Sequence, residues 1–267
     1  MKREDLTKVQ RWAIANRLAE ERLPCINANL ADVIPSGGLY VRYGKRTIDV
    51  VVSGAALVVT LPINAIIGVA TFFDVGCPII FKQVRVGKDE KPFQILKFRN
   101  MRNTTDEKGE LLPPSQRVTK FGKFVRRTSL DELLNFWSVF KGDMSLIGPR
   151  PLLPEYTHRY NKRHRMRLAV RPGLECPPRE FDGHVWTWQE QLDNDVWYVE
   201  NLSFKTDCKM FANLVRFTFD RKSAAARAVS KRGMFMGYSE EGVAINLQEV
   251  PQEYVDAVEA IEGAADE

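Results

Sequence analysis

Histidine and cysteine are scarce in this chain, and neither is placed to hold a metal or to form disulfides. The 267 residues include three histidines and four cysteines, and no two cysteines form a Cys-x-x-Cys pair. Zinc sites and disulfide frameworks depend on such close spacing. The sequence therefore predicts isolated thiols in a reducing compartment. The charged N-terminus also lacks a cleavage site, so we expect no cleaved signal peptide.

Basic residues are absent from the C-terminal segment. From Glu240 to the end the chain has nine acidic residues and no lysine or arginine, which leaves 39 basic against 25 acidic residues before it. This surplus of positive charge favours an anionic partner, which can be a nucleic acid, a phosphorylated substrate or an acidic membrane surface. No nucleic-acid-binding motif accompanies the charge, so we expect no nucleic acid partner.

Charged residues are also missing from residues 50–73, a run of 24 residues. At about 1.5 Å per residue, a helix of this length is long enough to cross a bilayer. A helix buried in a soluble protein is the alternative, but such helices rarely lack a polar face. Pro62 lies at the middle of the run, where proline removes a hydrogen bond and bends or breaks a helix. We therefore expect contact with the lipid bilayer and a membrane break at Pro62.

Basic residues flank the apolar run on both sides. Lysine and arginine favour the cytoplasmic side of a membrane, so neither flank is favoured to cross. A re-entrant helix that enters and leaves the same leaflet fits both observations, and a proline-kinked spanning helix is the alternative. Asp49 is expected at the interface, paired with Lys45 or Arg46. The flanking residues are Arg42, Lys45 and Arg46 before the run and Lys82, Arg85, Lys88 and Lys91 after it.

Both ends of the chain carry amphipathic segments. The first predicts either an interfacial helix on the membrane or a helix packed on the protein. The last is acidic and is repelled by an anionic membrane, so we expect it to dock on its own domain or on a second subunit of a homo-oligomer. A solvated terminus is the alternative. The apolar positions are Leu6, Val9, Trp12 and Ala13 in the first segment and Val250, Tyr254, Val255, Val258 and Ile261 in the last.

The remaining sequence predicts an α+β fold with few strands. Two strands are expected at residues 78–86 and 93–98, joined by a turn into a small β-hairpin. A polar loop is expected at residues 106–115, and helices at residues 130–140, 152–168 and 203–219. The expected architecture is a Pro-broken re-entrant membrane helix followed by a mostly helical domain.

Two acidic residues stand at the start of the first of these helices. Ser129 and Glu132 match a capping box, in which the serine caps the helix and the glutamate reaches back. Acidic side chains in a first turn also complement the helix dipole. The functional alternative is that Asp131 and Glu132, beside Arg126 and Arg127, bind Mg²⁺ and phosphate or attack phosphorus. Spacing alone leaves both interpretations open.

Four separated motifs, taken in order, resemble the bacterial sugar transferase family, the monotopic phosphoglycosyl transferases. Agreement of four motifs in order is far more specific than any one of them, and they extend from about residue 42 to residue 173. The motifs are Lys45-Arg46-x-x-Asp49, then Phe81-Lys82-Gln83-Val84-Arg85-Val86-Gly87 with Lys97-Phe98-Arg99-Asn100-Met101, then Thr128-Ser129-Leu130-Asp131-Glu132-Leu133, and Lys141-Gly142-Asp143-Met144-Ser145-Leu146-Ile147-Gly148-Pro149-Arg150-Pro151.

The resemblance implies a reaction on the cytoplasmic face of the bacterial inner membrane. Asp131 would attack the β-phosphate of a UDP-sugar and release UMP, leaving a phosphosugar on the enzyme. Polyprenyl (undecaprenyl) phosphate would then take that group, in the first membrane step of glycan assembly. The family also implies a Mg²⁺ cofactor, held by Glu132 with Asp131, which neutralises the charge of the diphosphate.

The same resemblance implies four substrate-binding residues, which are Lys97, Arg126, Arg150 and Asp195. Structural explanations exist for two of them, since Arg150 between two prolines fits a rigid turn and Lys97 fits an exposed strand. The resemblance also divides the chain into an N-terminal amphipathic extension (1–39), a membrane re-entrant region (40–75), a cytoplasmic catalytic domain (76–238) and an acidic C-terminal tail (239–267).

Residues 175–183 depart from the family pattern. After Arg-Pro-Gly-Leu the family continues Thr-Gly-Trp-Ala-Gln-Val-Asn-Gly-Arg, whereas this chain has two successive prolines, Arg179 in place of the glutamine and Gly183 in place of the arginine. We expect this segment to border the nucleotide-sugar pocket, so the donor is expected to be unusual. A catalytically silent relative that serves as a membrane scaffold for a glycan-assembly complex is the alternative.

Overall fold

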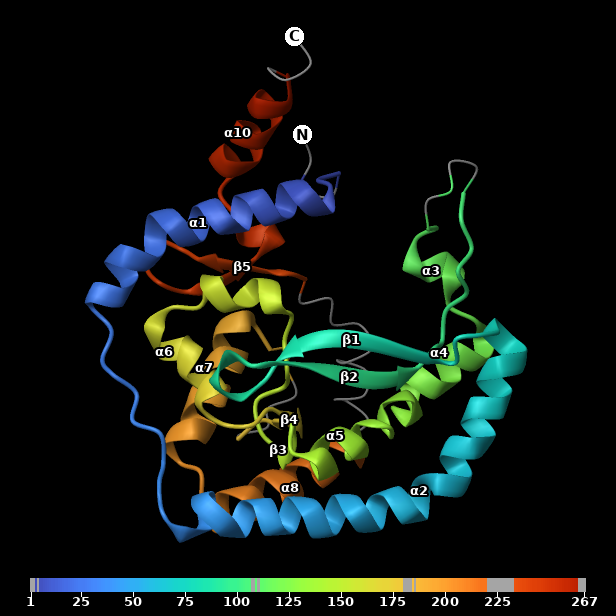
Figure 1. Cartoon of the computed structure of the whole chain (residues 1–267). Helices are drawn as coiled ribbons and strands as arrows, with labels where there is room; N and C mark the ends of the chain where they lie inside the picture. Colours follow the sequence, from blue (N-terminus) through green and yellow to red (C-terminus); the bar gives the residue numbers. More distant parts are fainter. Residues whose placement is uncertain are drawn as a thin grey trace.

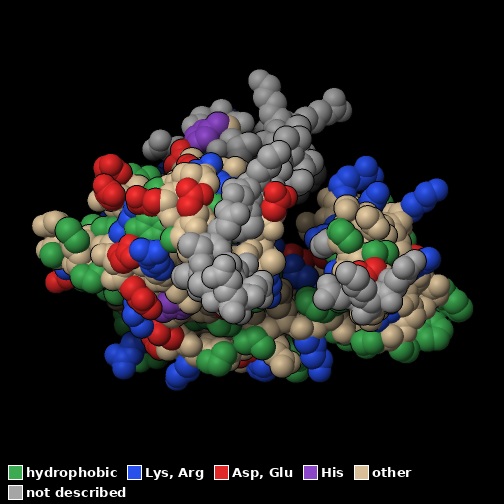
Figure 2. All heavy atoms as spheres, turned by 90° about the horizontal axis from the view of Figure 1, so that it is seen from above, with side chains coloured by type: hydrophobic (Ala, Val, Ile, Leu, Met, Phe, Trp, Pro, Cys, Tyr) green, Lys and Arg blue, Asp and Glu red, His purple; other side chains and the backbone are tan. Residues whose placement is uncertain are grey.

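The computed structural model describes residues 3, 5–106, 109, 111–179, 184, 186–219 and 233–263. Within these residues the chain forms three two-stranded sheets surrounded by helices (Figure 1), which confirms the predicted α+β class. Figure 2 views the molecule from the end that carries α1 and α10, and shows it hollowed between the main body and the lobe that carries α3 (Pro114–Arg117).

The predicted β-hairpin is present. Strand β1 (Ile80–Val86) runs antiparallel to β2 (Pro92–Phe98), with Phe81 opposite Lys97. The turn between them holds Asp89 and Glu90 at φ of 53° and 62°, the left-handed region that tight turns use. The hairpin therefore carries Lys97 on the strand end that is remote from its own turn.

The apolar run forms one long helix, α2 (Lys45–Val75), which follows a short π-helical turn (Tyr40–Gly44). The helix continues through Pro62, and Figure 1 shows that its course bends. The stretch Tyr40–Val75 is long and apolar enough to cross a membrane. Its most apolar 18-residue window has a mean hydropathy of 2.2, and only 11% of that window is buried. Val58, Leu61 and Ile66 are each about 70% exposed.

The N-terminal end of α2 is fixed to the rest of the protein by polar contacts. Lys45 Nζ lies 2.8 Å from an oxygen of Asp207. Arg46 donates to the backbone carbonyls of residues 139 and 140, at the end of α5 (Asn135–Lys141). Asp49 is buried and accepts hydrogen bonds from Ser145 Oγ and Leu146 N, both at 3.0 Å. The predicted pairing of Asp49 with Lys45 or Arg46 is therefore wrong, because both cations have other partners and strand β3 (Ser145–Ile147) supplies neutral donors to Asp49.

The C-terminal end of α2 is attached to the same body. Thr119 donates to Asp74 in the last turn, and Arg99 donates to the carbonyls of Val75 and Gly76. About two turns earlier, Ile67 packs in a buried cluster with Phe98 of β2. Both ends of the apolar helix thus contact one folded domain, although a straight helix of 31 residues would separate them by roughly 46 Å.

The helices after the hairpin are shorter than the sequence indicated. Residues 130–140 form a 3₁₀ turn and then α5 instead of one helix, and residues 152–168 form three short helical pieces. The prediction for residues 203–219 is confirmed by α8. The elements are α4 (Lys120–Arg127), 3₁₀ turns at Leu130–Glu132, Pro154–Arg159 and Met166–Ala169, α6 (Lys162–Arg165), α7 (Trp188–Glu200) and α8 (Phe204–Phe219), with β3 (Ser145–Ile147) parallel to β4 (Gly173–Glu175).

The two ends of the chain fold together. Helix α1 (Lys8–Ala28) packs against the hairpin β5 (Phe235–Tyr238) and β6 (Ala244–Asn246) and against α10 (Gln252–Gly263), at the end of the molecule away from the first half of α2 (Figure 1). Their shared buried cluster, here called the terminal cluster, contains Leu6, Ile14, Ala15, Leu18, Met236, Ile245, Leu247, Val250, Tyr254 and Val255.

This packing decides between the alternatives for both ends. Helix α1 packs on protein, and its buried face is centred on Ile14 and Leu18, whereas Val9 is 76% exposed. The tail docks on its own chain through Val250, Tyr254 and Val255. This was one of the two predicted docking partners, the other being a second subunit. The side chains of residues 258 and 261 lie outside the described part of the chain.

Candidate active site

A distorted turn presents Asp131 and Glu132. Helix α4 ends at Arg127, and Ser129 follows at φ 56°, in the left-handed region that non-glycine residues seldom adopt. Its side chain makes no capping hydrogen bond, so the capping-box interpretation is wrong. The next three residues form a 3₁₀ turn. Such uncommon backbone conformations concentrate at functional sites, which fits the functional alternative.

Glu132 is held between two cations. Lys97 Nζ lies 2.6 Å from Glu132 Oε1, and Arg150 Nη2 lies 2.8 Å from the same oxygen. Burial would raise the pKa of Glu132, but the charges and hydrogen bonds of Arg150 and Lys97 outweigh burial and lower it. Glu132 therefore stays ionised, and the structure brings together three of the residues that the sequence assigned to the site.

Asp131 has the opposite environment. Its side chain is 6% exposed, and its nearest side-chain donor is Asn100 Nδ2, at 3.3 Å from Oδ2. Burial raises its pKa, and the negative charge of Glu132 raises it further, while Lys97 and Arg126 lower it less. Two neighbouring carboxylates therefore differ in basicity, and the more basic, less solvated one is Asp131.

Arg150 joins the dyad to the segment that departs from the family pattern. Its Nη1 lies 2.9 Å from Glu175 Oε2, while its Nη2 reaches Glu132. The pKa of Arg150 is raised, first by the charge of Glu175 and, against burial, also by Glu132. A cavity of about 70 Å³ beside this cluster is lined by Arg85, Ile95, Lys97, Glu132, Asn135, Met144, Arg150, Pro151, Leu152 and Leu174. That volume holds an ion with a few waters but not a nucleotide sugar.

Asp195 lies behind the site rather than in it. It is 1% exposed on α7 and forms an ion pair of 2.8 Å with Arg167, which is equally buried. Arg167 Nη2 in turn donates to the backbone carbonyl of Arg150 at 2.7 Å. The pair therefore braces the loop that carries Arg150. No sequence motif indicated Arg167, because its role depends on a contact with α7 that is distant in the chain.

The remaining predicted residues lie farther out. Arg126 is exposed in the last turn of α4 and acts on Asp131 through its charge. Pro62 lies within α2 and does not line the cavity beside Glu132. The predicted roles of Arg126, Pro62 and Asp195 stay predictions.

The donor set fits one mode of magnesium binding. The described residues contain no group of three or more histidine, cysteine, aspartate or glutamate side chains that could enclose a metal. Magnesium, however, is usually bound by one or two carboxylates together with substrate phosphates and waters. Asp131 and Glu132 can supply those carboxylates, since Lys97 and Arg150 both engage the same Glu132 oxygen, Oε1.

The class of protein follows from a family match over most of the chain that carries this cluster. The model of the family described as "Bacterial sugar transferase" matches residues 40–221, and the chain belongs to that family. It is similar to an uncharacterized sugar transferase of Bacillus subtilis (strain 168), with 43% identity over 142 residues, covering 53% of this chain and 70% of the relative.

Two relatives with specific names match over a longer stretch. The UDP-glucose:undecaprenyl-phosphate glucose-1-phosphate transferases of Klebsiella pneumoniae and Escherichia coli (strain K12) are 34% and 37% identical to this chain over 190 residues. These matches cover 67% of this chain and 41% of each relative, so the chain spans less than half the length of both.

Proposed function

We propose that this protein transfers a sugar 1-phosphate from a UDP-sugar to polyprenyl (undecaprenyl) phosphate, through a phosphosugar carried on Asp131. The observation that supports the proposal most strongly is the contrast within the dyad. A poorly solvated, more basic Asp131 stands beside Glu132, which Lys97 and Arg150 hold in its ionised form. The names of the Klebsiella and Escherichia relatives describe the same type of reaction.

The proposed chemistry has two balanced steps. An Asp131 oxygen attacks the β-phosphorus of the UDP-sugar and forms an O–P bond, while the bond from that phosphorus to the bridging oxygen breaks and its electron pair leaves with UMP. A phosphate oxygen of the polyprenyl carrier then attacks the same phosphorus, and Asp131 leaves as a carboxylate. Neither step needs a proton from Asp131.

The cations near the dyad suit these steps. Attack of a carboxylate on a diphosphate brings negative charges together, so the transition state needs positive charge that is already in place. Lys97 and Arg150 supply it, and Arg167 with Asp195 fixes the backbone of Arg150. Mg²⁺ bound by Glu132 with Asp131 would polarise the phosphate oxygens and add to this neutralisation.

We also propose a re-entrant membrane helix on the cytoplasmic face of the bacterial inner membrane. Supporting it are the exposed apolar surface of α2 and the attachment of both its ends to one domain. Exposed Trp137 and Phe140 of α5 extend the apolar surface, since α5 packs along α2. A site on this domain would meet a carrier whose phosphate lies at the membrane surface.

One observation favours a second candidate, a catalytically silent scaffold. Glu175, which belongs to the divergent segment, occupies one side of the Arg150 guanidinium. An arginine that is already neutralised binds substrate phosphate less well. The intact dyad and its cations argue against loss of activity, so transfer remains the better proposal.

The decisive experiment measures UMP. Detergent-solubilised protein is incubated with Mg²⁺, polyprenyl phosphate and a panel of UDP-sugars, and with donor alone to trap a phosphosugar on the peptide that contains Asp131. We expect UMP release with at least one donor, a labelled peptide, and loss of both in Asp131→Asn. Full activity of Asp131→Asn would disprove the covalent step, and no UMP with any donor would favour the scaffold.

Stability provides the control for this variant. Because burial raises the folded-state pKa of Asp131 above its unfolded value, ionised Asp131 lowers the stability of the folded state at pH values above both. Asp131→Asn removes that charge, so its melting temperature at neutral pH should equal or exceed that of the wild type. A lower melting temperature would mean that lost activity reflects unfolding.

A further inference from the structure

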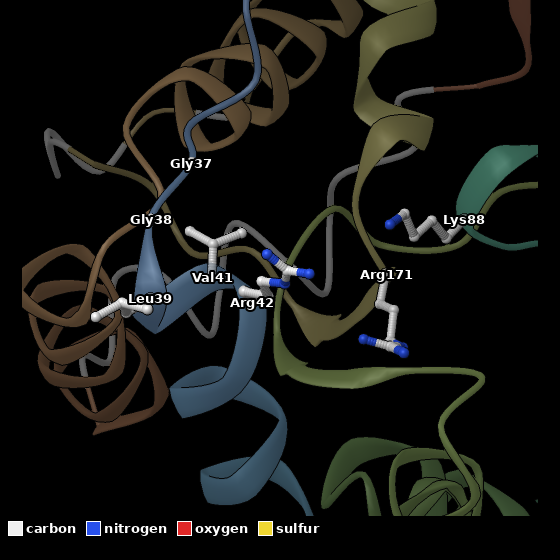
Figure 3. Close-up of a pocket in the computed structure, with 7 residues that line it drawn as sticks. All are labelled: Gly37, Gly38, Leu39, Val41, Arg42, Lys88 and Arg171. Atoms are coloured by element: carbon white, nitrogen blue, oxygen red, sulfur yellow. The ribbon is translucent and has the colours of Figure 1, made fainter.

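A larger hollow lies at the N-terminal mouth of α2. Its volume is about 660 Å³, compared with about 70 Å³ for the cavity beside Glu132. We call it the α2-mouth groove. The segment that precedes α2 forms its apolar side, and three cations complete its wall (Figure 3). The lining residues are Gly37, Gly38, Leu39, Val41, Arg42, Lys88 and Arg171.

The three cations come from separate parts of the chain. Arg42 belongs to the turn before α2, Lys88 to the turn of the β1–β2 hairpin, and Arg171 to the loop before β4. In Figure 3 the side chains of Arg42 and Lys88 point toward one another across the groove. The lining residues that the structure describes include no aspartate or glutamate. Cations that converge without a carboxylate create a potential that attracts an anion.

The surroundings hold this charge in place. Arg171 Nε donates to the carbonyl of Gly142 at 2.9 Å, which anchors the side chain beside the groove. An adjoining hollow shares Lys88 and Arg171 and adds Lys91 to the positive lining. It also contains two acidic residues, of which Asp143 is paired with Lys141 at 2.6 Å.

An apolar strip continues from the groove along α2. Leu39 is 80% exposed at the rim, and Val51 and Val52 are 64% and 44% exposed in the second turn of the helix. Cations beside an exposed apolar strip match a molecule with an anionic head and hydrocarbon chains. We propose that the α2-mouth groove binds the phosphate of an anionic phospholipid, whose acyl chains lie along α2. The inference rests on the proposed insertion of α2 into the membrane.

The length of strand β2 argues against the reacting carrier as the occupant. Lys97 follows Pro92, next to the turn, by five positions along β2, which corresponds to roughly 17 Å at about 3.3 Å per residue. A nucleophile attacks from about 3 Å. A polyprenyl phosphate seated in the groove would be too far from Asp131 to accept the phosphosugar, so the groove is a separate lipid site.

The test measures lipid binding in a non-ionic detergent, where no charged surface attracts the protein. Native mass spectrometry of the full chain compares a phosphatidylglycerol with a phosphatidylcholine of the same acyl chains. Arg42→Gln/Lys88→Gln removes two cations of the groove. The matched control, Lys205→Gln/Lys209→Gln, removes two exposed cations of α8. This helix also lies near the start of α2, since the Phe204 ring is 5.7 Å from the Tyr40 ring.

We expect the wild type to prefer phosphatidylglycerol. The groove variant should lose about 25-fold in affinity for phosphatidylglycerol, from about fivefold for each of the two cations. The control should change by less than about twofold. Unchanged binding in the groove variant, or an equal loss in the control, would overturn the proposal. Displacement of phosphatidylglycerol by polyprenyl phosphate, together with loss of transfer in the groove variant, would assign the groove to the carrier instead.

Transfer is measured on the same samples. If no sample releases UMP and only the groove variant loses phosphatidylglycerol, the proposed reaction fails and the lipid site stands. If the wild type releases UMP and shows no preference for phosphatidylglycerol, the lipid site fails and the reaction stands.

Discussion

At the scale of single residues, the environment of Asp131 predicts the pH dependence of the reaction. In the proposed mechanism attack requires the ionised carboxylate, so activity should rise as the pH rises through the pKa of Asp131. Because burial and Glu132 raise that pKa, the acid limb of kcat/KM should lie above the usual range for aspartate. Arg126 lowers the pKa of Asp131, so Arg126→Gln should move the limb to higher pH by roughly a few tenths of a unit.

The measurement is a pH profile of UMP release. The pH at the midpoint of the acid limb does not depend on the maximal rate, so a variant with lower activity can still be compared. Arg127→Gln removes the neighbouring exposed charge in the same turn and provides the control. A limb that moves to lower pH in Arg126→Gln would contradict the assignment of Asp131 as the titrating nucleophile.

Glu175 yields a second prediction at this scale. The carboxylate of Glu175 accepts a hydrogen bond from Nη1 of Arg150. Arg150 therefore has one donor fewer for a substrate phosphate. Glu175→Gln should therefore lower the KM for the UDP-sugar by about fivefold and leave kcat within about twofold. Glu200→Gln, which breaks a remote ion pair with Arg163, is the matched control. A higher KM in Glu175→Gln would show that Glu175 positions Arg150 rather than competing with the substrate.

The sequence predicted some of these residues better than others. The family motifs pointed to Lys97, Glu132 and Arg150. The structure brings Lys97 and Arg150 within 2.8 Å of the same oxygen of Glu132. The sequence could not indicate Arg167, because the role of that side chain depends on its burial against Asp195. Nor could spacing show that Ser129 adopts a left-handed conformation, which turns the expected helix start into the turn that carries the dyad.

At the scale of elements, local sequence patterns predicted a helix or strand correctly only where that element depends on local contacts. The β1–β2 hairpin follows from alternation and turn residues, and it was predicted nearly to the residue. The expected helix at residues 152–168 is broken because buried Arg159 and His164 make contacts with β5, which the local pattern does not contain. Long-range polar contacts thus overrode helix periodicity there.

The proposed re-entrant course of α2 makes a prediction about topology. Single cysteines at residue 31, before the helix, and at residue 104, after it, should lie on the same side of the membrane. In a background from which the four native cysteines have been removed, Ala31→Cys and Thr104→Cys should both be protected from an impermeant thiol reagent in intact cells. Both positions are exposed in the fold, so protection reports the membrane. Reaction at one position alone would show that the helix spans the bilayer.

At the scale of the whole molecule, the terminal cluster contributes to stability but not to chemistry. Val255 is fully buried there, so Val255→Ala should destabilise the fold by about 2 kcal/mol, which lowers the melting temperature by about 4–8 °C. Because the cluster is remote from Asp131, kcat should stay unchanged. Val243→Ala, where the side chain is 47% exposed, is the control and should change the melting temperature by less than about 2 °C. An unaltered melting temperature in Val255→Ala would mean that the tail is not docked in solution.

The terminal cluster also sets an order of events during synthesis. Helix α1 leaves the ribosome well before the β5–β6 hairpin and α10, which cover its apolar face. Residue 235 follows residue 28 by 207 residues, which corresponds to roughly 10–40 s of translation. Throughout that interval the apolar face around Ile14 and Leu18 lacks the strands and helix that cover it, although the 3₁₀ turn Pro154–Arg159, which also contacts α1, is made earlier. A nascent chain that stalls late therefore displays an uncovered amphipathic helix, the kind of surface that chaperones bind.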